Sequence, residues 1–153
     1  MRQDSKLSGV LHVLLHMLGM KAPATSEQLA KMMGTNPVVV RRVMAGLRKQ
    51  GFVASAKGHG GGWAIACDPK AVTLADIYEA VGEPPLVALG HRSENPDCLV
   101  EQAVNHALDH TFREVEALFH AKLSAVTLAD LSKDFNRRFA KRGTSHKDHP
   151  HAQ

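Results

Sequence analysis

The sequence predicts a mainly α-helical fold with one small β-hairpin and a long helix in its second half. Three observations support this prediction. Apolar residues recur at helical spacing along most of the chain, beginning at residue 5. A glycine-rich run, KGHGGGW, joins two short stretches of strand character. From Cys98 to Leu123, an apolar pattern of helical period continues for about seven turns at 3.6 residues per turn.

Two helices are predicted before the hairpin region. The first, at residues 5–19, carries a wide stripe of leucine and valine, which is typical of a helix packed in a core. His12 and His16 share one of its faces, but no acidic residue or cysteine lies near them. We interpret them as ordinary partly buried histidines rather than as a metal pair. Thr25 followed by Gln28 is a capping-box signature that marks the start of the second helix.

A third helix is predicted to begin at Pro37 and to end before Gly51. Asn36 is a favourable N-cap, and a proline at the first helical position loses no hydrogen bond. The glycine fits the position just beyond the helix. One face of this helix is apolar and the remainder is basic. Residues 25–50 therefore predict a helix-turn-helix.

A β-hairpin follows, with strand character from Phe52 and again from Trp63. Its tip carries Lys57 and His59, and four glycines allow the backbone to turn sharply and to approach another molecule closely. A helix-turn-helix followed by a cationic hairpin is the layout of a recognition helix and a wing. We predict a winged helix-turn-helix DNA-binding domain at residues 1–67.

The second half is predicted to contain three helices and one loop. Thr73 with Asp76 marks the start of a helix that stops at Gly82, and a loop follows at residues 83–97, in which residues 86–89 could form a short strand. The predicted long helix, from Cys98 to Leu123, is longer than the core of a small domain can cover. We expect its apolar stripe to be covered partly by the first helix and partly by the same helix of a second subunit, in a twofold homodimer.

The C-terminal part divides into two regions. A further capped helix is predicted at residues 127–135, and it completes a connecting and dimerisation region at residues 68–135. Residues 136–153 are basic and lack apolar periodicity, so we predict a tail that is disordered or helical only at its start.

Charge is distributed unevenly along the chain. Residues 1–68 hold nine Lys or Arg against three acidic residues, residues 69–135 hold five against eleven, and the tail holds five against one. A basic module joined to an acidic one favours contact between the first half and a polyanion. No apolar run reaches the roughly 18 residues needed to span a membrane, and the first residues are too polar for a signal peptide. Cys67 and Cys98 fit neither a disulfide framework nor a zinc site, so we predict a reduced, cytoplasmic protein.

The residues LRKQGFVASAKGHGGGWAIA, followed by VTLADIYEAVGE, resemble the Rrf-type family of winged-helix transcriptional regulators, typified by IscR and NsrR. The resemblance runs from the first helix to about Leu131 and is most specific from Leu47 to Glu83. There the chain follows the family pattern of a helix ending LRKxG, a wing SxxGxxGG with a following aromatic residue, and a helix start TLxD. The resemblance implies a DNA-binding winged helix with a long dimerisation helix.

One departure from the family concerns its cofactor. Cluster-binding members carry several cysteines in the loop and at the start of the long helix, whereas only Cys98 lies in that region here. Because several thiolates usually hold an Fe–S cluster, we predict no cofactor, and the chain resembles the cluster-free branch. Cys98 lies near the start of the long helix, where the helix dipole can stabilise a thiolate, so it is a candidate redox switch. An inert buried cysteine is the alternative.

Candidate DNA contacts follow from this layout. In a helix-turn-helix the start of the second helix faces base edges, while other groups contact phosphates. We favour Arg41 over Arg42 for a bidentate contact to guanine because it lies one turn on from Val38. The candidate residues are Thr25, Ser26 and Gln28 for phosphates, Thr35, Asn36, Val38, Val39, Arg41 and Arg42 for the major groove, and Lys57 and His59 for the minor groove or its phosphates.

From these features we predict a homodimeric repressor that binds a palindromic operator. Three other functions are weighed against this prediction. The sequence has no nucleophile elbow, phosphate loop, HExxH motif or paired carboxylates that would indicate an enzyme. A winged helix could instead bind a protein without DNA. A metal-responsive or small-ligand-responsive regulator of the same fold is a further alternative. Its metal ligands would be His106 and His110, or the terminal His146, His149 and His151.

Overall fold

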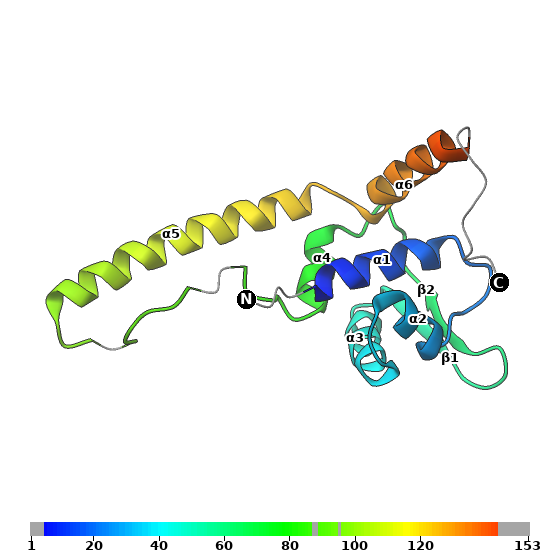
Figure 1. The fold of residues 1–153 in the computed structure, drawn as a ribbon, viewed down its shortest axis with the longest axis horizontal. Helices are drawn as coiled ribbons and strands as arrows, with labels where there is room; N and C mark the ends of the chain where they lie inside the picture. The colour runs from blue at the N-terminus through cyan, green and yellow to red at the C-terminus, as the bar shows by residue number, and fades with distance from the viewer. Residues whose placement is uncertain (1–4, 87–88, 95, 144–153) are drawn as a thin grey trace.

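The computed structural model of the chain describes residues 5–86, 89–94 and 96–143. Within these residues it has six helices and one antiparallel sheet of two strands, which confirms the predicted mainly α fold with a small wing (Figure 1). In chain order the elements are α1 (Lys6–Leu18), α2 (Ser26–Met33), α3 (Pro37–Lys49), β1 (Val53–Ala56), β2 (Gly62–Ile65), α4 (Leu74–Ala80), α5 (Leu99–Ser124) and α6 (Leu128–Gly143).

The helices of the helix-turn-helix begin where the sequence predicts. The N–H of Gln28 donates to Thr25 Oγ1 at 3.2 Å, and the N–H of Thr25 donates to Gln28 Oε1 at 2.8 Å, which completes the capping box of α2. The N–H of Val39 donates to Asn36 Oδ1 at 3.1 Å and caps α3. Gly51, with a φ of 81°, follows α3 in the left-handed conformation expected of a residue just beyond a helix.

The wing is tied to the connector between α1 and α2. β1 pairs with β2 in a register that places Val53 opposite Ile65. The backbone of Trp63 also exchanges two hydrogen bonds with Ala24, of 2.9 and 2.8 Å. Gly62 has a φ of 145°, and a Cβ at this position would lie 2.5 Å from the carbonyl oxygen of Ala24. This glycine is therefore needed for packing the wing, whatever the tip contacts.

The hydrophobic core lies between α1, α2, α3, the wing and α4. It does not end at residue 67, where the sequence suggests a domain boundary. Val72, Ile77 and Val81 around α4 are buried in the same cluster, and so is Leu128 at the start of α6. The connecting helix and the first turn of α6 are thus packed as part of the winged-helix unit.

The long helix α5 projects away from this unit (Figure 1). It has 26 residues, none of them buried, and spans about 39 Å at 1.5 Å per residue. Its C-terminal end packs on α4. The large apolar side chains exposed along one side of α5, here called the α5 stripe, are Val100, Val104, Leu108, Val115 and Leu118.

The expectation that the first helix covers part of the α5 stripe is wrong. α1 packs instead against α2, α6, β2 and α4. Its buried side chains belong to the core of the winged-helix unit.

α6 is longer than predicted and continues to Gly143. Residues 136–143, assigned from the sequence to a tail, are therefore helical. Asp134 pairs with Arg137 and Arg138 one turn further along, and the rings of Phe135 and Phe139 lie 6.0 Å apart on one face of the helix, so both kinds of contact support its extension.

Two predictions fall at least partly outside the described residues. These are the disordered tail, at residues 144–153, and the short strand at residues 86–89, of which residues 87 and 88 are not described. In the part of the chain that is described, no helix is both long enough and apolar enough to cross a membrane.

Candidate nucleic-acid interface

α3 has one face in the core and the opposite face in solvent. Its buried residues are Val40, Val43, Met44 and Leu47. Because successive residues of a helix turn by about 100°, the opposite direction is taken by residues that recur every three or four positions. This α3 outer face consists of Val38, Arg42, Ala45 and Lys49.

The other two arginines of α3 are held by neighbouring elements. Arg41 Nη2 lies 3.1 Å from Glu27 Oε1 of α2. Arg48 Nη1 donates to Ser55 Oγ at 3.1 Å, and its guanidinium lies 5.8 Å from the ring centroid of Trp63. Arg41 therefore links α3 to α2, and Arg48 links α3 to the wing.

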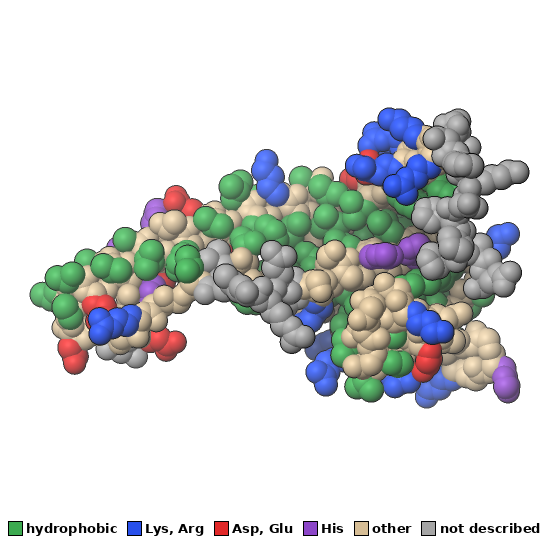
Figure 2. Space-filling model, viewed as in Figure 1, with side chains coloured by type: hydrophobic (Ala, Val, Ile, Leu, Met, Phe, Trp, Pro, Cys, Tyr) green, Lys and Arg blue, Asp and Glu red, His purple; other side chains and the backbone are tan. Residues whose placement is uncertain are grey.

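The basic side chains of the outer face have no such partners. Within the described chain, Arg42 and Lys49 form no ion pair and no side-chain hydrogen bond, and both are exposed. Val38, 61% exposed, lies between them and the start of the helix. Figure 2 shows Lys and Arg side chains gathered along the edge beside α3, and a separate group over α6.

The start of α3 and the wing tip extend this surface. Thr35 and Asn36 are exposed at the turn before α3, and Lys57 and His59 are exposed at the hairpin tip. Val39 differs from the prediction, because its side chain is partly buried and packs against the core rather than facing outward.

The start of α2 is only partly available to a ligand. Ser26 is 9% exposed, and its hydroxyl accepts a hydrogen bond of 3.0 Å from Trp63 Nε1. The hydroxyl of Ser26 thus already has a partner within the core, and the prediction that Ser26 contacts a phosphate stays a prediction. Thr25 and Gln28 are exposed, but their side chains already close the capping box.

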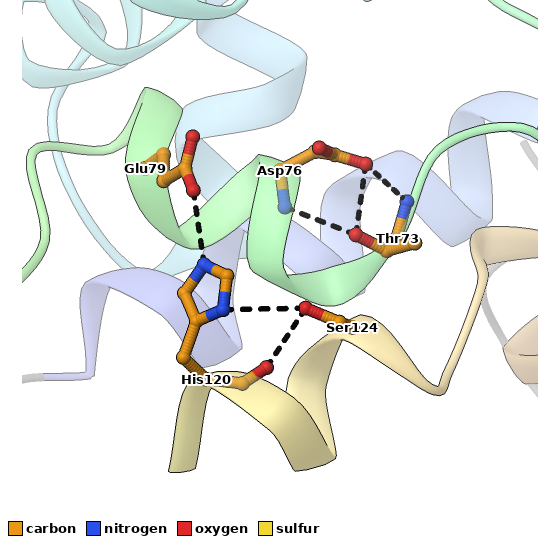
Figure 3. A network of polar contacts seen from close by, with 5 residues as sticks. All are labelled: Thr73, Asp76, Glu79, His120 and Ser124. Atoms are coloured by element: carbon orange, nitrogen blue, oxygen red, sulfur yellow. Dashed lines mark hydrogen bonds and ion pairs between the residues drawn. The ribbon is translucent and has the colours of Figure 1, made fainter. Parts of the chain in front are cut away.

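A polar network joins α5 to the winged-helix unit (Figure 3). His120 Nε2 of α5 lies 3.0 Å from Glu79 Oε1 of α4, and the hydroxyl of Ser124 donates to the carbonyl oxygen of His120 at 2.9 Å. The rings of Tyr78 and Phe119 meet edge to face at 5.3 Å. These contacts fix the direction in which α5 leaves the unit that carries α3.

The loop before α5 folds back along the first half of that helix. His91 Nε2 lies 2.7 Å from Asp109 Oδ1, and Asn105 Nδ2 donates to the carbonyl oxygen of Ser93 at 2.8 Å. Gln102 Nε2 donates to the carbonyl oxygen of Pro96 at 3.0 Å. The loop is therefore held against α5 by side chains of the helix.

Cys98 is exposed at the N-cap of α5. The backbone N–H of Glu101, and then that of Val100, lower the pKa of its thiol. Cys67, just after β2, is half-buried against the core, and burial raises the pKa of its thiol. The thiol pKa is thus lowered at Cys98 and raised at Cys67. A redox switch at Cys98 requires such an exposed thiol with a lowered pKa.

The histidines named as possible metal ligands are described only in part. Among the residues that the structure describes, no three His, Cys, Asp or Glu side chains are placed to hold a metal ion. The rings of His12 and His16 stack at 4.8 Å, and His110 lies 3.6 Å from Glu114 on the same helix. The terminal His146, His149 and His151 lie outside the described residues.

The chain is similar in sequence to two HTH-type transcriptional regulators. YwnA of Bacillus subtilis (strain 168), provisionally described as an HTH-type transcriptional regulator, is 32% identical over 128 residues, which cover 84% of this chain and 95% of YwnA. The HTH-type transcriptional regulator IscR of Vibrio atlanticus (strain LGP32) is 27% identical over 129 residues, covering 84% of this chain and 70% of that protein.

A solved structure shares the fold of this chain, and a family model matches most of its sequence. The structure of T. potens IscR covers 97% of this chain and 94% of its own, with a TM-score of 0.60 and 20% identity, and shares the fold. The model of the Rrf2 family, described as iron-dependent transcriptional regulators, matches residues 3–134. The chain therefore belongs to the Rrf2 family of transcriptional regulators.

Proposed function

We propose that this regulator is a homodimeric repressor that binds a twofold-symmetric operator through the α3 outer face and the wing tip. The α3 outer face is the observation that carries the proposal. It presents Arg42 and Lys49 without protein partners, beside an apolar Val38, while the opposite face of the helix is fixed in the core. Unpaired cations gain by releasing counterions from DNA phosphates, and a guanidinium can also read a base.

Arg42 is the candidate for base recognition. Arg41, which the sequence alone favours, lies 3.1 Å from Glu27 and would have to leave that carboxylate before it contacted a base. Arg42 belongs to the outer face and forms no ion pair with a carboxylate in the described part of the chain. A bidentate contact from Arg42 to guanine would contribute about 1–3 kcal/mol of discrimination. Val38 would contact a thymine methyl group or sugar carbons.

The remaining contacts are proposed to be with the DNA backbone. Lys57 and His59 at the exposed wing tip suit the minor groove or its flanking phosphates. At α2, a helix of eight residues, the backbone N–H groups of Ser26 and Glu27 suit a phosphate, because those of Thr25 and Gln28 already donate within the capping box.

The homodimer is proposed to form through the α5 stripe. Contiguous apolar surface of this kind marks an interface, because burying it stabilises a complex by about 25 cal/mol per Å². The stripe lies on a helix that projects beyond its own core, and Figure 2 shows hydrophobic side chains following the length of α5. A second copy carries the same stripe, and twofold pairing of two α5 helices would place two α3 helices on one palindromic site.

We further propose that DNA binding needs no Fe–S cluster. The family is described as iron-dependent, but the donor set here does not fit a cluster, because Cys98 is the one cysteine at the loop and α5. Iron analysis and visible absorption of the protein purified without oxygen test this. A stoichiometric cluster that is needed for operator binding would contradict it.

DNA from the promoter of the regulator's own gene tests the repressor proposal. DNase footprinting at low salt should show a twofold-symmetric protected site. By fluorescence anisotropy, Arg42→Ala should weaken cognate binding by about 1–3 kcal/mol and relax base preference. Lys57→Ala should weaken all sequences alike and lower the salt slope by about 1. Arg113→Ala, on exposed α5, is the matched control and should bind as the wild type does.

Two outcomes would count against these assignments. If no palindromic fragment is bound at low salt, the repressor proposal fails and a protein-binding winged helix becomes the better interpretation. If Arg41→Ala relaxes base preference more than Arg42→Ala, the roles of the two arginines are reversed.

A further inference from the structure

A cavity of about 460 Å³ opens between the loop at Gly90 to Arg92 and the first half of α5. One wall is apolar and consists of Val100, Val104 and Leu108, which also belong to the α5 stripe. The rest is polar. The cavity is therefore amphipathic and lies beside the surface proposed to hold the second copy.

Two residues that line the cavity each have a buried polar atom without a hydrogen-bond partner. Across the described residues, the buried side-chain nitrogen and oxygen atoms that lack any hydrogen-bond partner are His91 Nδ1 and Glu101 Oε1. Both residues line this cavity. The other ring nitrogen of His91 is held by Asp109 at 2.7 Å, which fixes the ring. Because buried polar atoms are nearly always paired in folded proteins, two exceptions in the lining of one cavity indicate that the described chain alone does not satisfy the polar groups around it.

The two charged side chains that line the cavity, Arg92 and Glu101, form no ion pair within the described residues, although oppositely charged groups within 4.0 Å would form one. Arg92 has no carboxylate partner elsewhere in that part of the chain. A molecule that carries an ammonium group and a carboxylate at once is complementary to this pair.

We propose that this cavity binds a free α-amino acid with an apolar side chain. Its ammonium group bonds to Glu101, its carboxylate bonds to Arg92, and its side chain packs on Val104 and Leu108. Because the cavity borders the α5 stripe, an occupied cavity changes how two copies pack and so the spacing of their α3 helices. This regulatory consequence rests on the proposed function, whereas amino-acid binding does not.

Isothermal titration calorimetry on the full chain tests the binding. The probes are L-valine, L-leucine, L-isoleucine, L-methionine and L-phenylalanine. At least one should bind with one site per chain and a Kd below about 1 mM. Its N-acetyl derivative, which lacks the ammonium group, and its amide, which lacks the carboxylate, should each bind at least about tenfold more weakly.

Matched variants locate the site. Glu101→Gln and Arg92→Met should each weaken the probe by at least about tenfold. Glu114→Gln and Arg113→Met remove the same kinds of charge from exposed positions of α5 that do not line the cavity. They should bind the probe as the wild type does.

Several results would overturn the proposal. It fails if none of the five probes binds, if the derivatives bind as well as the parent amino acid, or if the control variants lose as much affinity as the cavity variants. It also fails if Glu101→Gln shifts the dimer equilibrium in analytical ultracentrifugation while no probe binds, because the cavity is then filled by the second copy. Operator binding separates the two proposals: a wild-type protein that binds an amino acid but no DNA refutes only the repressor function.

Discussion

At the scale of single residues, the hydrogen bond between Trp63 Nε1 and Ser26 Oγ joins the wing to α2 inside the core. Ser26→Ala leaves the buried indole N–H without its partner, which costs about 1–3 kcal/mol. We expect the free energy of unfolding to fall by that amount. Urea denaturation followed by circular dichroism, at one fixed protein concentration, measures it.

A double-mutant cycle provides the control for Ser26. In a Trp63→Phe background the donor is gone, so Ser26→Ala should cost clearly less than it does in the wild type. DNA affinity of Ser26→Ala, measured well below its unfolding midpoint, should be unchanged. A loss of DNA affinity without a loss of stability would instead support a phosphate contact.

Cys98 and Cys67 should differ in reactivity. Backbone N–H groups lower the pKa of the Cys98 thiol, whereas burial raises that of Cys67. At any given pH the thiol with the lower pKa has the larger thiolate fraction, so Cys98 should be the more reactive of the two, and Cys98 is also exposed. Limited alkylation with iodoacetamide, followed by mass spectrometry, should label Cys98 first, and its rate should rise at lower pH than that of Cys67.

The same difference tests the redox switch. If oxidation acts through Cys98, peroxide should release DNA from the wild type but not from Cys98→Ser, and Cys67→Ser should behave as the wild type does. Faster labelling of Cys67, or unchanged peroxide sensitivity of Cys98→Ser, would remove Cys98 from this role.

At this scale the sequence could predict candidates but not their partners. Arg41 and Arg42 are adjacent and both basic, so spacing alone could not show that Glu27, 14 positions earlier, holds the first. The burial of Ser26 depends on Trp63, 37 residues away. Such distant pairings leave no local signal in one sequence.

At the scale of elements, helix starts were predictable and helix packing was not. Capping residues act within three positions, so Thr25, Asn36 and Thr73 marked the starts of α2, α3 and α4. The extension of α6 is accompanied by ion pairs of Asp134 and by contact between the rings of Phe135 and Phe139, and neither pairing was used in the prediction from sequence. The packing of α1 against α2, α6, β2 and α4 is tertiary structure, and the apolar periodicity of one helix does not show which elements it will contact.

Two glycines within helices should respond to alanine in opposite ways. A Cβ at Gly46 of α3 would lie 2.8 Å from the carbonyl oxygen of Ala80, so Gly46→Ala forces α3 and α4 apart. We expect a loss of about 1–3 kcal/mol in the free energy of unfolding, in spite of the better helix propensity of alanine. Thermal or urea unfolding measures the loss.

Gly9→Ala is the matched control, because Gly9 also lies within a helix, in the first turn of α1. Its added Cβ would meet the flexible end of Met33 at 3.5 Å, an ordinary contact. Alanine here should stabilise the protein by about 0.5–1 kcal/mol. Equal effects of the two substitutions would show that the approach of α3 to α4 does not restrict residue 46.

At the scale of the whole molecule, α5 is both fixed to the DNA-binding unit and left uncovered. The junction that fixes it joins His120 to Glu79 across 41 residues, and the sequence offered no sign of this pairing. The length and the stripe of α5 were visible from periodicity alone. A single chain therefore predicts that the stripe needs a partner, while the direction of α5 comes only from the structure.

The α5 stripe provides the test of the homodimer. Val115, 40% exposed, lies within the stripe, and Val115→Glu would place a charge in the proposed interface. We expect the dimer dissociation constant to rise by at least about tenfold in analytical ultracentrifugation. Operator affinity should fall with it, because two linked winged helices bind a palindrome far better than one.

Ala117→Glu is the control for this change, since it adds the same charge to the same helix on a side that faces away from the stripe. It should leave the dimer and operator affinity as they are. Both variants should keep the helical circular dichroism of the wild type, because neither position is buried in the isolated chain. If Val115→Glu leaves the dimer intact while Ala117→Glu dissociates it, the second copy packs on the other side of α5, and the α5 stripe is not the interface.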